Sequence, residues 1–220
     1  MNTELKITAD GSHTIINKDL NVSYHSTHGA IQESQHVYID TGLRHIKKKK
    51  ISILEVGFGT GLNALLTLMN SDDNHSEILY EAIELHPLDS VCISSLNYLS
   101  ILNAEYLREK FMAMHSSPWN AQTNISGTFQ LNKLHGDIRD IAISSTFDLV
   151  YFDAFDPAVQ PEIWTTDVFK KIYMSMNEGG TLVTYSSKAV IRRMMETAGF
   201  RIEKVQGPWG KREIVRAEKR

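Results

Sequence analysis

The chain has 220 residues, enough to bury the core of one domain, and its 42% hydrophobic and 22% charged residues are proportions of an ordinary soluble globular protein. A net charge of -3 argues against binding of nucleic acid through an overall basic surface. The single cysteine, Cys92, excludes an internal disulfide, and no charged segment followed by an apolar one opens the chain, so we expect a cytoplasmic protein without membrane insertion.

The first 46 residues are expected to form a cap. Two β-rich pieces, residues 13–17 and 20–24, flank a polar turn and predict a hairpin. Apolar residues at helical spacing then predict a short amphipathic helix within residues 29–39. Residues 47–50 are four lysines, which favour a solvated linker although they could meet phosphates. The main domain is expected to span residues 47–220.

Apolar strands alternate with helical stretches along the main domain. Strands are predicted over residues 51–56, 78–83, 128–134, 147–152, 180–185, 200–205 and 212–217, and helices over residues 62–69, 87–99, 162–176 and 187–198. This order predicts a Rossmann-like α/β fold with a mostly parallel seven-stranded sheet, helices on both faces and a ligand crevice at the carboxyl ends of the strands. Residues 100–127 are less regular and indicate either an active-site lid or a helix and loop packed on one edge.

A glycine motif follows the first of these strands. Gly57, Gly59 and Gly61 stand between a strand and a helix, where glycine permits a tight turn and the close approach of a ligand to free helix N–H groups. The G-x-G-x-G spacing differs from the G-x-G-x-x-G of dinucleotide folds. With Glu55 two residues before the first glycine, it resembles motif I of class I S-adenosylmethionine methyltransferases.

Carboxylates follow the next strands. Glu84 ends the second strand, where an ionised acid can accept hydrogen bonds from both hydroxyls of a ribose; without the glycines it would be read as a surface carboxylate. Asp137, after a further strand, matches the place where this fold commonly carries an acid near the adenine amino group. The nine histidines lack companions at ligand spacing, so no metal site is predicted.

The strand over residues 147–152 ends in Asp153, facing the place where a methyl group would leave sulfonium. An amine acceptor must be neutral to react, and for a lysine-like amine with a pKa of about 10.4 this costs at most about 4 to 5 kcal/mol at pH 7. Asp153 can orient such an amine and take its proton, so we assign it as the catalytic carboxylate. Phe155 and Pro157 are expected to shape the pocket.

These residues together resemble the methyltransferase part of the MnmC family, which completes 5-methylaminomethyl groups on the wobble uridine of tRNA. The resemblance covers most of the chain and includes residues 33–38, 55–63, 136–138, 153–157, 161–164, 179–181, 190–193, 198–200 and 211–213. It implies that S-adenosylmethionine is held by the glycine motif with Glu55 and Asn63 and by Glu84 and Asp137. It also implies that Asp153 faces the aminomethyl acceptor. The residues it offers for tRNA phosphate are Arg192, Arg193, Lys211 and Arg212.

The chain departs from the bifunctional members of that family. These carry a C-terminal flavin-dependent oxidase domain that removes a carboxymethyl group, and this sequence has no second nucleotide motif. We therefore expect methylation alone, of 5-aminomethyl(-2-thio)uridine to 5-methylaminomethyl(-2-thio)uridine, with a separate enzyme supplying the aminomethyl uridine. Ala154, where the family often has glycine, would narrow the pocket. Two alternatives stay open: a polyamine aminopropyltransferase, which shares the fold and an aspartate-rich strand end, and a small-amine methyltransferase, consistent with the acidic pI.

Overall fold

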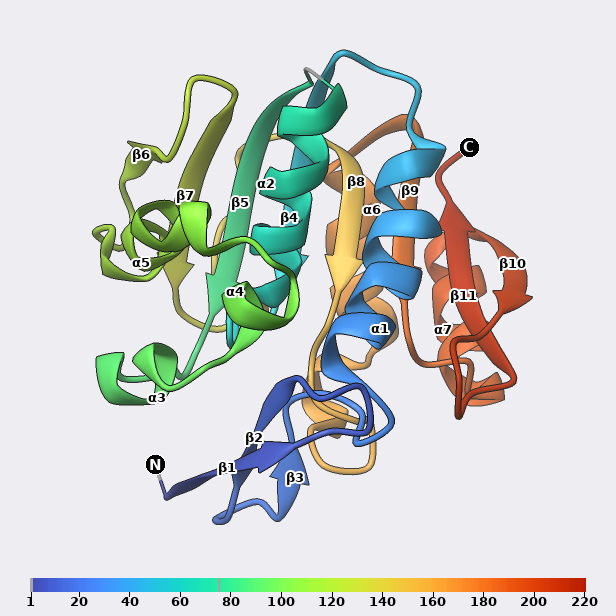
Figure 1. Ribbon diagram of the computed structural model, residues 1–220. Coiled ribbons are helices and arrows are strands. Elements are labelled where there is room, and N and C mark those ends of the chain that lie inside the picture. Colours follow the sequence, from blue (N-terminus) through green and yellow to red (C-terminus); the bar gives the residue numbers. More distant parts are fainter. Residues whose placement is uncertain (1, 75) are drawn as a thin grey trace.

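A central eight-stranded sheet organises the computed structural model, which describes residues 2–74 and 76–220 (Figure 1). The strand order is β10-β11-β9-β8-β4-β5-β7-β6, and the five strands from β9 to β7 run parallel. The bounds are β4 (Lys50–Val56), β5 (Glu77–Glu84), β6 (Gln122–Asn124), β7 (Phe129–His135), β8 (Phe147–Phe152), β9 (Met176–Thr184), β10 (Arg201–Gln206) and β11 (Glu213–Glu218). Every residue of β8 is buried, as expected for a parallel strand covered on both faces.

Helices cover both faces of the sheet, as predicted. Figure 1 shows α1 (Ala30–Ser34) and α2 (Leu62–Asn74) in front of the sheet and α6 (Thr166–Met174) and α7 (Ala189–Ala198) behind it. Side chains alternate along β4: Ile51 and Ile53 join the core cluster of the front face, whereas Leu54 and Val56 join that of the rear face. No helix among the described residues is both long and apolar enough to cross a membrane.

The N-terminal segment forms a separate three-stranded antiparallel sheet at the end of the molecule toward which the parallel strands point (Figure 1). Its strands are β1 (Thr3–Ile7), β2 (His13–Asn17) and β3 (Val22–Ser23). The β2–β3 pair confirms the predicted hairpin, whereas β1 was not predicted. It is a short edge strand that is exposed from Glu4 to Ile7, so its side chains lack the alternating burial of a half-buried strand.

The helix predicted within residues 29–39 is present as α1, which continues in the π-helical segment η1 (Gln35–Asp40). Its residues Val37, Tyr38 and Ile39 are fully buried in the front core cluster. This helix therefore packs on the main sheet, and the division of the chain at residue 46 stays a prediction.

Three predicted elements differ from the structure. The sheet has eight strands rather than seven, because residues 122–124 of the irregular region pair with β7 as an antiparallel edge. The helix predicted over residues 87–99 is two short helices, α3 (Ser90–Ser94) and α4 (Tyr98–Ile101). Asn97 interrupts it, since its side chain accepts from the amide of His13 and donates to the carbonyl of Gly11. The helix predicted over residues 162–176 is the short 3-10 turn η4 (Pro161–Ile163) followed by α6, which Thr165 caps.

The remaining elements lie in the irregular region and before β4. They are η2 (Leu43–His45), η3 (Glu105–Leu107) and α5 (Arg108–Ser116). Phe111 and Met114 of α5 are buried in the front core cluster, so of the two interpretations of residues 100–127 the packed helix is the one observed.

Candidate active site

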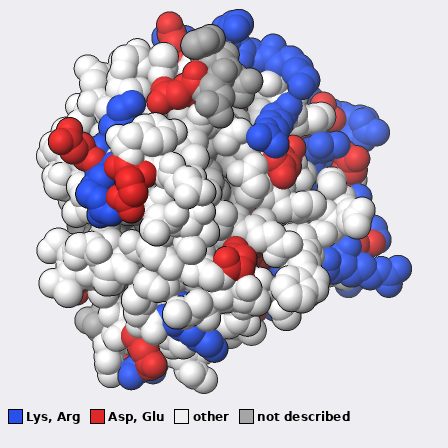
Figure 2. All heavy atoms as spheres, in the orientation of Figure 1, with Lys and Arg blue, Asp and Glu red and all other residues white. Residues whose placement is uncertain are grey.

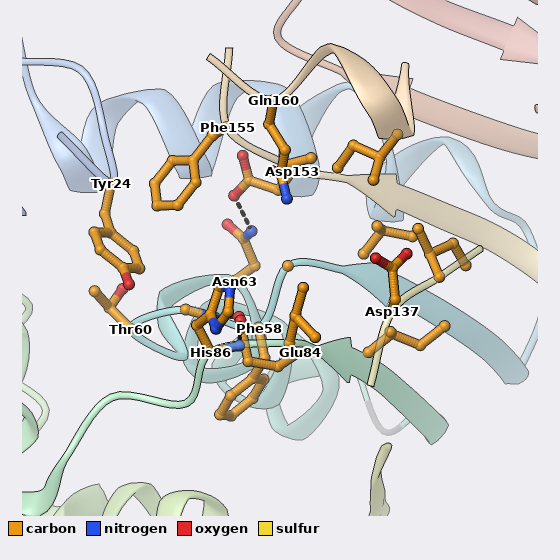
Figure 3. A pocket seen from close by; sticks show the side chains of 18 of the residues that line it. Tyr24, Phe58, Thr60, Asn63, Glu84, His86, Asp137, Asp153, Phe155 and Gln160 are labelled. Atoms are coloured by element: carbon orange, nitrogen blue, oxygen red, sulfur yellow. Dashed lines mark hydrogen bonds between the residues drawn. The ribbon is translucent and has the colours of Figure 1, made fainter. Parts of the chain in front are cut away.

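A pocket opens at the carboxyl ends of β4, β5, β7 and β8 (Figure 3). Side chains that Figure 3 labels around it are Tyr24, Phe58, Thr60, Asn63, Glu84, His86, Asp137, Asp153, Phe155 and Gln160. The pocket therefore occupies the crevice that the alternating strands and helices predict.

The glycine motif forms the loop between β4 and α2. Gly57 has a φ of +93°, and a Cβ there would lie 2.6 Å from the carbonyl oxygen of Asp153, so only glycine lets this loop approach the end of β8. Gly59 also has a positive φ and lines the pocket. Gly61 does not line it, because its Cα faces the imidazole of His115.

Glu84 lies at the end of β5 and is held by two backbone amides. Its Oε2 accepts from the N–H of Gly59 at 2.9 Å and its Oε1 from the N–H of His86 at 2.8 Å. A carboxylate offers about four lone-pair positions, so these two bonds leave acceptors free. Glu84 is therefore both oriented and able to bind a further donor from the pocket.

Asp137 lines the pocket from the loop after β7 and forms an ion pair with Arg139, whose Nη2 lies 2.6 Å from Oδ2. Hydrogen bonds from this arginine hold the pKa of the Asp137 carboxyl below its usual range. Sequence reasoning overlooked Arg139, although a residue two positions from the acid can reach it across a turn.

Asp153 directly follows β8, and each of its two carboxylate oxygens accepts one hydrogen bond. The hydroxyl of Tyr38 donates to Oδ1 at 2.6 Å. Nδ2 of Asn63 donates to Oδ2 at 2.8 Å (Figure 3). Burial raises the pKa of Asp153 to about 6, against the lowering effect of these two hydrogen bonds. The carboxylate is thus ionised near pH 7 and still basic enough to take a proton.

Glu55 lies behind the pocket and not on its wall. Its side chain is fully buried, Oε1 accepts from Nδ2 of Asn63 at 2.9 Å, and burial raises the pKa of Glu55 well above its usual value. Asn63 therefore joins two carboxylates through one amide nitrogen. Its Oδ1 is buried and has no hydrogen-bond partner within the described chain, although Asn63 lines the pocket. An unpaired buried acceptor fits a ligand that brings a donor.

A second pocket is also lined by Asp153. Both pockets are lined by Tyr24, His25, Asp153, Ala154 and Phe155, and only the second by Asn21, Val22, Ser23, Ser26, Glu33, Asp156, Tyr185 and Lys211. The rings of Tyr24 and Phe155 meet edge to face at 5.0 Å. Burial lowers the pKa of His25 to about 4, so its imidazole is neutral near pH 7. Asp153 thus stands at the junction of two compartments.

Lys211 lies inside this second compartment rather than on an open surface. Its Nζ forms an ion pair with Glu33 and lies 4.2 Å from the ring centroid of Tyr185. Glu33 also accepts from the amide of Ser26 through Oε2. The pair therefore links the N-terminal segment, α1 and the C-terminal hairpin beside Asp153.

The other predicted substrate residues lie outside both pockets. Pro157 is half-buried in the loop after β8, and Arg193 and Arg212 are exposed. A hydrogen bond from Lys204 lowers the pKa of Glu213 most, and the positive charges of Arg212 and Arg192 lower it further. Of the four predicted phosphate-binding residues, the structure therefore places Lys211 in the second compartment and Arg192, Arg193 and Arg212 outside both pockets.

Comparison with known proteins gives three kinds of match. A family model described as S-adenosyl-L-methionine-dependent methyltransferase matches residues 103–220. The tRNA 5-methylaminomethyl-2-thiouridine biosynthesis bifunctional protein MnmC of Burkholderia thailandensis is 30% identical over 212 residues, which cover 89% of this chain and 32% of that protein. The chain thus spans about a third of the length of the curated relatives it matches.

Solved structures agree with the fold. The crystal structure of MNMC2 from Aquifex aeolicus superposes with a TM-score of 0.80 at 28% identity, covering all of this chain and 70% of that one. Spermidine synthase from Thermotoga maritima superposes with a TM-score of 0.52 at 13% identity, a likeness of fold alone.

Proposed function

Since this chain belongs to the S-adenosyl-L-methionine-dependent methyltransferase family, we propose that it methylates the aminomethyl group of 5-aminomethyl(-2-thio)uridine at the wobble position of tRNA. The product would be 5-methylaminomethyl(-2-thio)uridine, and the names of the curated relatives contain the 2-thio form of this nucleoside. The observation that carries the proposal is the position of Asp153 between a glycine-lined pocket and a second compartment with further carboxylates.

The glycine-lined pocket is the proposed cofactor site. Bound S-adenosylmethionine supplies a methyl group activated by a positively charged sulfur. Glu84, oriented by two amides, has lone pairs for ribose hydroxyls, and the unpaired Oδ1 of Asn63 can accept from an ammonium group. Asp137 is proposed to lie near the adenine. Glu55 would act indirectly, by fixing Asn63.

Asp153 is proposed to prepare the acceptor amine. An ammonium has no lone pair, so the amine must lose a proton before or during transfer. A carboxylate with a pKa of about 6 is largely ionised at pH 7 and close enough to that pH to accept a proton efficiently. Tyr38 and Asn63 fix the plane of the carboxylate and leave lone pairs free to orient the amine.

The second compartment is the proposed acceptor site. Its carboxylates, Asp153, Glu33 and Asp156, favour a small cationic amine over a neutral group. Lys188 forms an ion pair with Asp156, and Lys211 forms one with Glu33. Asp153 instead accepts hydrogen bonds from two neutral donors, the hydroxyl of Tyr38 and the amide of Asn63. We therefore place Lys211 in the acceptor site, and leave Arg192, Arg193 and Arg212 as the candidates for tRNA phosphate.

The decisive test is transfer of labelled methyl from S-adenosylmethionine to tRNA from cells lacking this protein, followed by mass spectrometry of the nucleosides. A gain of one methyl on 5-aminomethyl(-2-thio)uridine is expected. No transfer, with cofactor binding confirmed by calorimetry, would overturn the proposal. Decarboxylated S-adenosylmethionine with polyamines, and small amines with the ordinary cofactor, then test the two alternative acceptor classes.

The proposal also places the protein in a reaction sequence. The substrate must already bear the aminomethyl group, so we propose that a separate enzyme forms that group before this protein acts. A tRNA substrate would put the reaction in the cytoplasm, which agrees with the single, unpaired cysteine.

A further inference from the structure

We propose that Trp209 is a stacking platform for a tRNA base that neighbours the modified uridine. This inference rests on the proposed tRNA substrate. It concerns how the RNA is positioned and not the chemistry at Asp153.

Trp209 stands at the tip of the turn between β10 and β11. Two backbone hydrogen bonds close this turn, from Gly207 to the carbonyl of Arg212 at 3.1 Å and from Lys211 to the carbonyl of Pro208 at 2.9 Å. The indole is nevertheless 67% exposed. The closed turn fixes the backbone that carries the indole and leaves most of the ring open to solvent, so a base could stack on it.

The turn lies at the rim of the proposed acceptor site. Lys211, two residues after Trp209, lines that compartment. On the other side, the ring of His28 lies 5.8 Å from the indole, and the amide of His28 donates to Oγ of Ser26, which also lines the compartment. Lys211 and Ser26, the hydrogen-bond partner of His28, therefore connect the surroundings of Trp209 with the compartment that Asp153 lines.

The surroundings of Trp209 favour RNA over an apolar partner. Arg212 is exposed in the same turn, and Lys204 of β10 forms an ion pair with Glu213, the residue after Arg212, at 3.0 Å. Lys and Arg side chains also gather along the right-hand side of Figure 2, where Figure 1 places the C-terminal strands. Single-stranded RNA loops are recognised by aromatic side chains that stack on unpaired bases, with Arg and Lys meeting the phosphates. An exposed indole bordered by cations has this composition.

The first test is kinetic. Trp209→Ala is expected to raise KM for tRNA roughly tenfold or more, the effect of losing one stacked base, with kcat at saturating tRNA and cofactor affinity unchanged within about twofold. Trp209→Phe should retain most of the affinity. Tyr106→Ala is the matched control, since Tyr106 is 76% exposed in η3 and lines neither pocket.

The second test measures RNA binding in the absence of methyl transfer. An unmodified anticodon stem-loop RNA should quench the tryptophan fluorescence of the wild type, and Trp209→Phe, which keeps Trp119 and Trp164, should abolish that quenching. If the wild type methylates tRNA but Trp209→Ala leaves KM unchanged, or quenching persists in Trp209→Phe, the inference is wrong and the proposed function stands. If tRNA is not methylated, the proposed function fails, and the quenching result alone decides whether Trp209 binds RNA.

Discussion

Replacing Asp153 by asparagine removes a charge and a proton acceptor while keeping the shape of the side chain. The amide can still accept from Asn63, and its NH2 group can donate to the Tyr38 oxygen once that hydroxyl rotates, so the site should stay folded. A positioned general base contributes about 10²- to 10⁴-fold to a rate. We therefore expect Asp153→Asn to lower kcat with tRNA by that factor while leaving cofactor affinity within about threefold.

The same substitution is expected to stabilise the folded protein at neutral pH. Burial raises the pKa of Asp153 from 3.8 to about 6, so the folded state holds this proton more tightly than the unfolded state. Its contribution to stability is present below pH 4 and is lost as the pH rises from about 4 to 6. A rise of this size corresponds to roughly 3 kcal/mol, an upper value because the amide forms a weaker set of hydrogen bonds. Asp153→Asn should therefore be more stable than the wild type at pH 7.5, by roughly 1 to 3 kcal/mol, and lose that advantage toward pH 4.5.

Urea unfolding at a series of pH values measures the stability, and single-turnover methyl transfer measures the rate. Asp167→Asn, which removes an exposed carboxylate in the first turn of α6, is the matched control: it should leave the transfer rate unchanged and lower stability by no more than about 1 kcal/mol, the effect of one charge at a helix N-terminus. The reasoning would be refuted by a variant that transfers methyl at the wild-type rate. A stability difference that stays constant from pH 4.5 to 8 would refute the assigned burial effect alone.

Three further predictions concern the surrounding residues. Tyr38→Phe removes the hydrogen bond that most lowers the pKa of Asp153, so the acidic limb of the pH profile of kcat/KM should move upward from about 6; an unmoved limb would contradict this. Gly57→Ala would place a Cβ 2.6 Å from a carbonyl oxygen at a φ of +93°, and calorimetry should show cofactor affinity reduced roughly tenfold or more, whereas Gly127→Ala, whose Cβ meets nothing within 4 Å, should bind normally. Arg212→Ala should weaken tRNA binding across all tRNAs and reduce the slope of log Kd against log salt by about 1, and a slope equal to that of the wild type would exclude a phosphate contact.

Local sequence patterns predicted most of the fold. The apolar run of β8, the glycine loop after β4 and the alternation of strands with helices are short-range features, because side-chain periodicity and the conformational freedom of glycine act over a few residues. The carboxylates at the strand ends followed from the same pattern, since parallel strands bring their carboxyl ends to one edge. For this reason Glu84, Asp137 and Asp153 could be placed in one crevice from the sequence.

Contacts between distant segments decided the rest. Asn97 belongs to a helical pattern, but its hydrogen bonds to the N-terminal segment compete with the helix, and no periodicity reports them. Tyr38 reads as an ordinary core residue of an amphipathic helix, yet it reaches Asp153 across 115 residues of sequence. Lys211 reads as a surface cation of a basic segment, yet its partner Glu33 is 178 residues away.

The sequence by itself therefore determined the α/β architecture, the glycine loop and the carboxylates that face the crevice, because each depends on residues close together in the chain. Only the tertiary structure decided how those carboxylates are held and tuned. Burial and the choice of hydrogen-bond donor set the pKa of Asp153, and both depend on which remote segments pack against the end of β8.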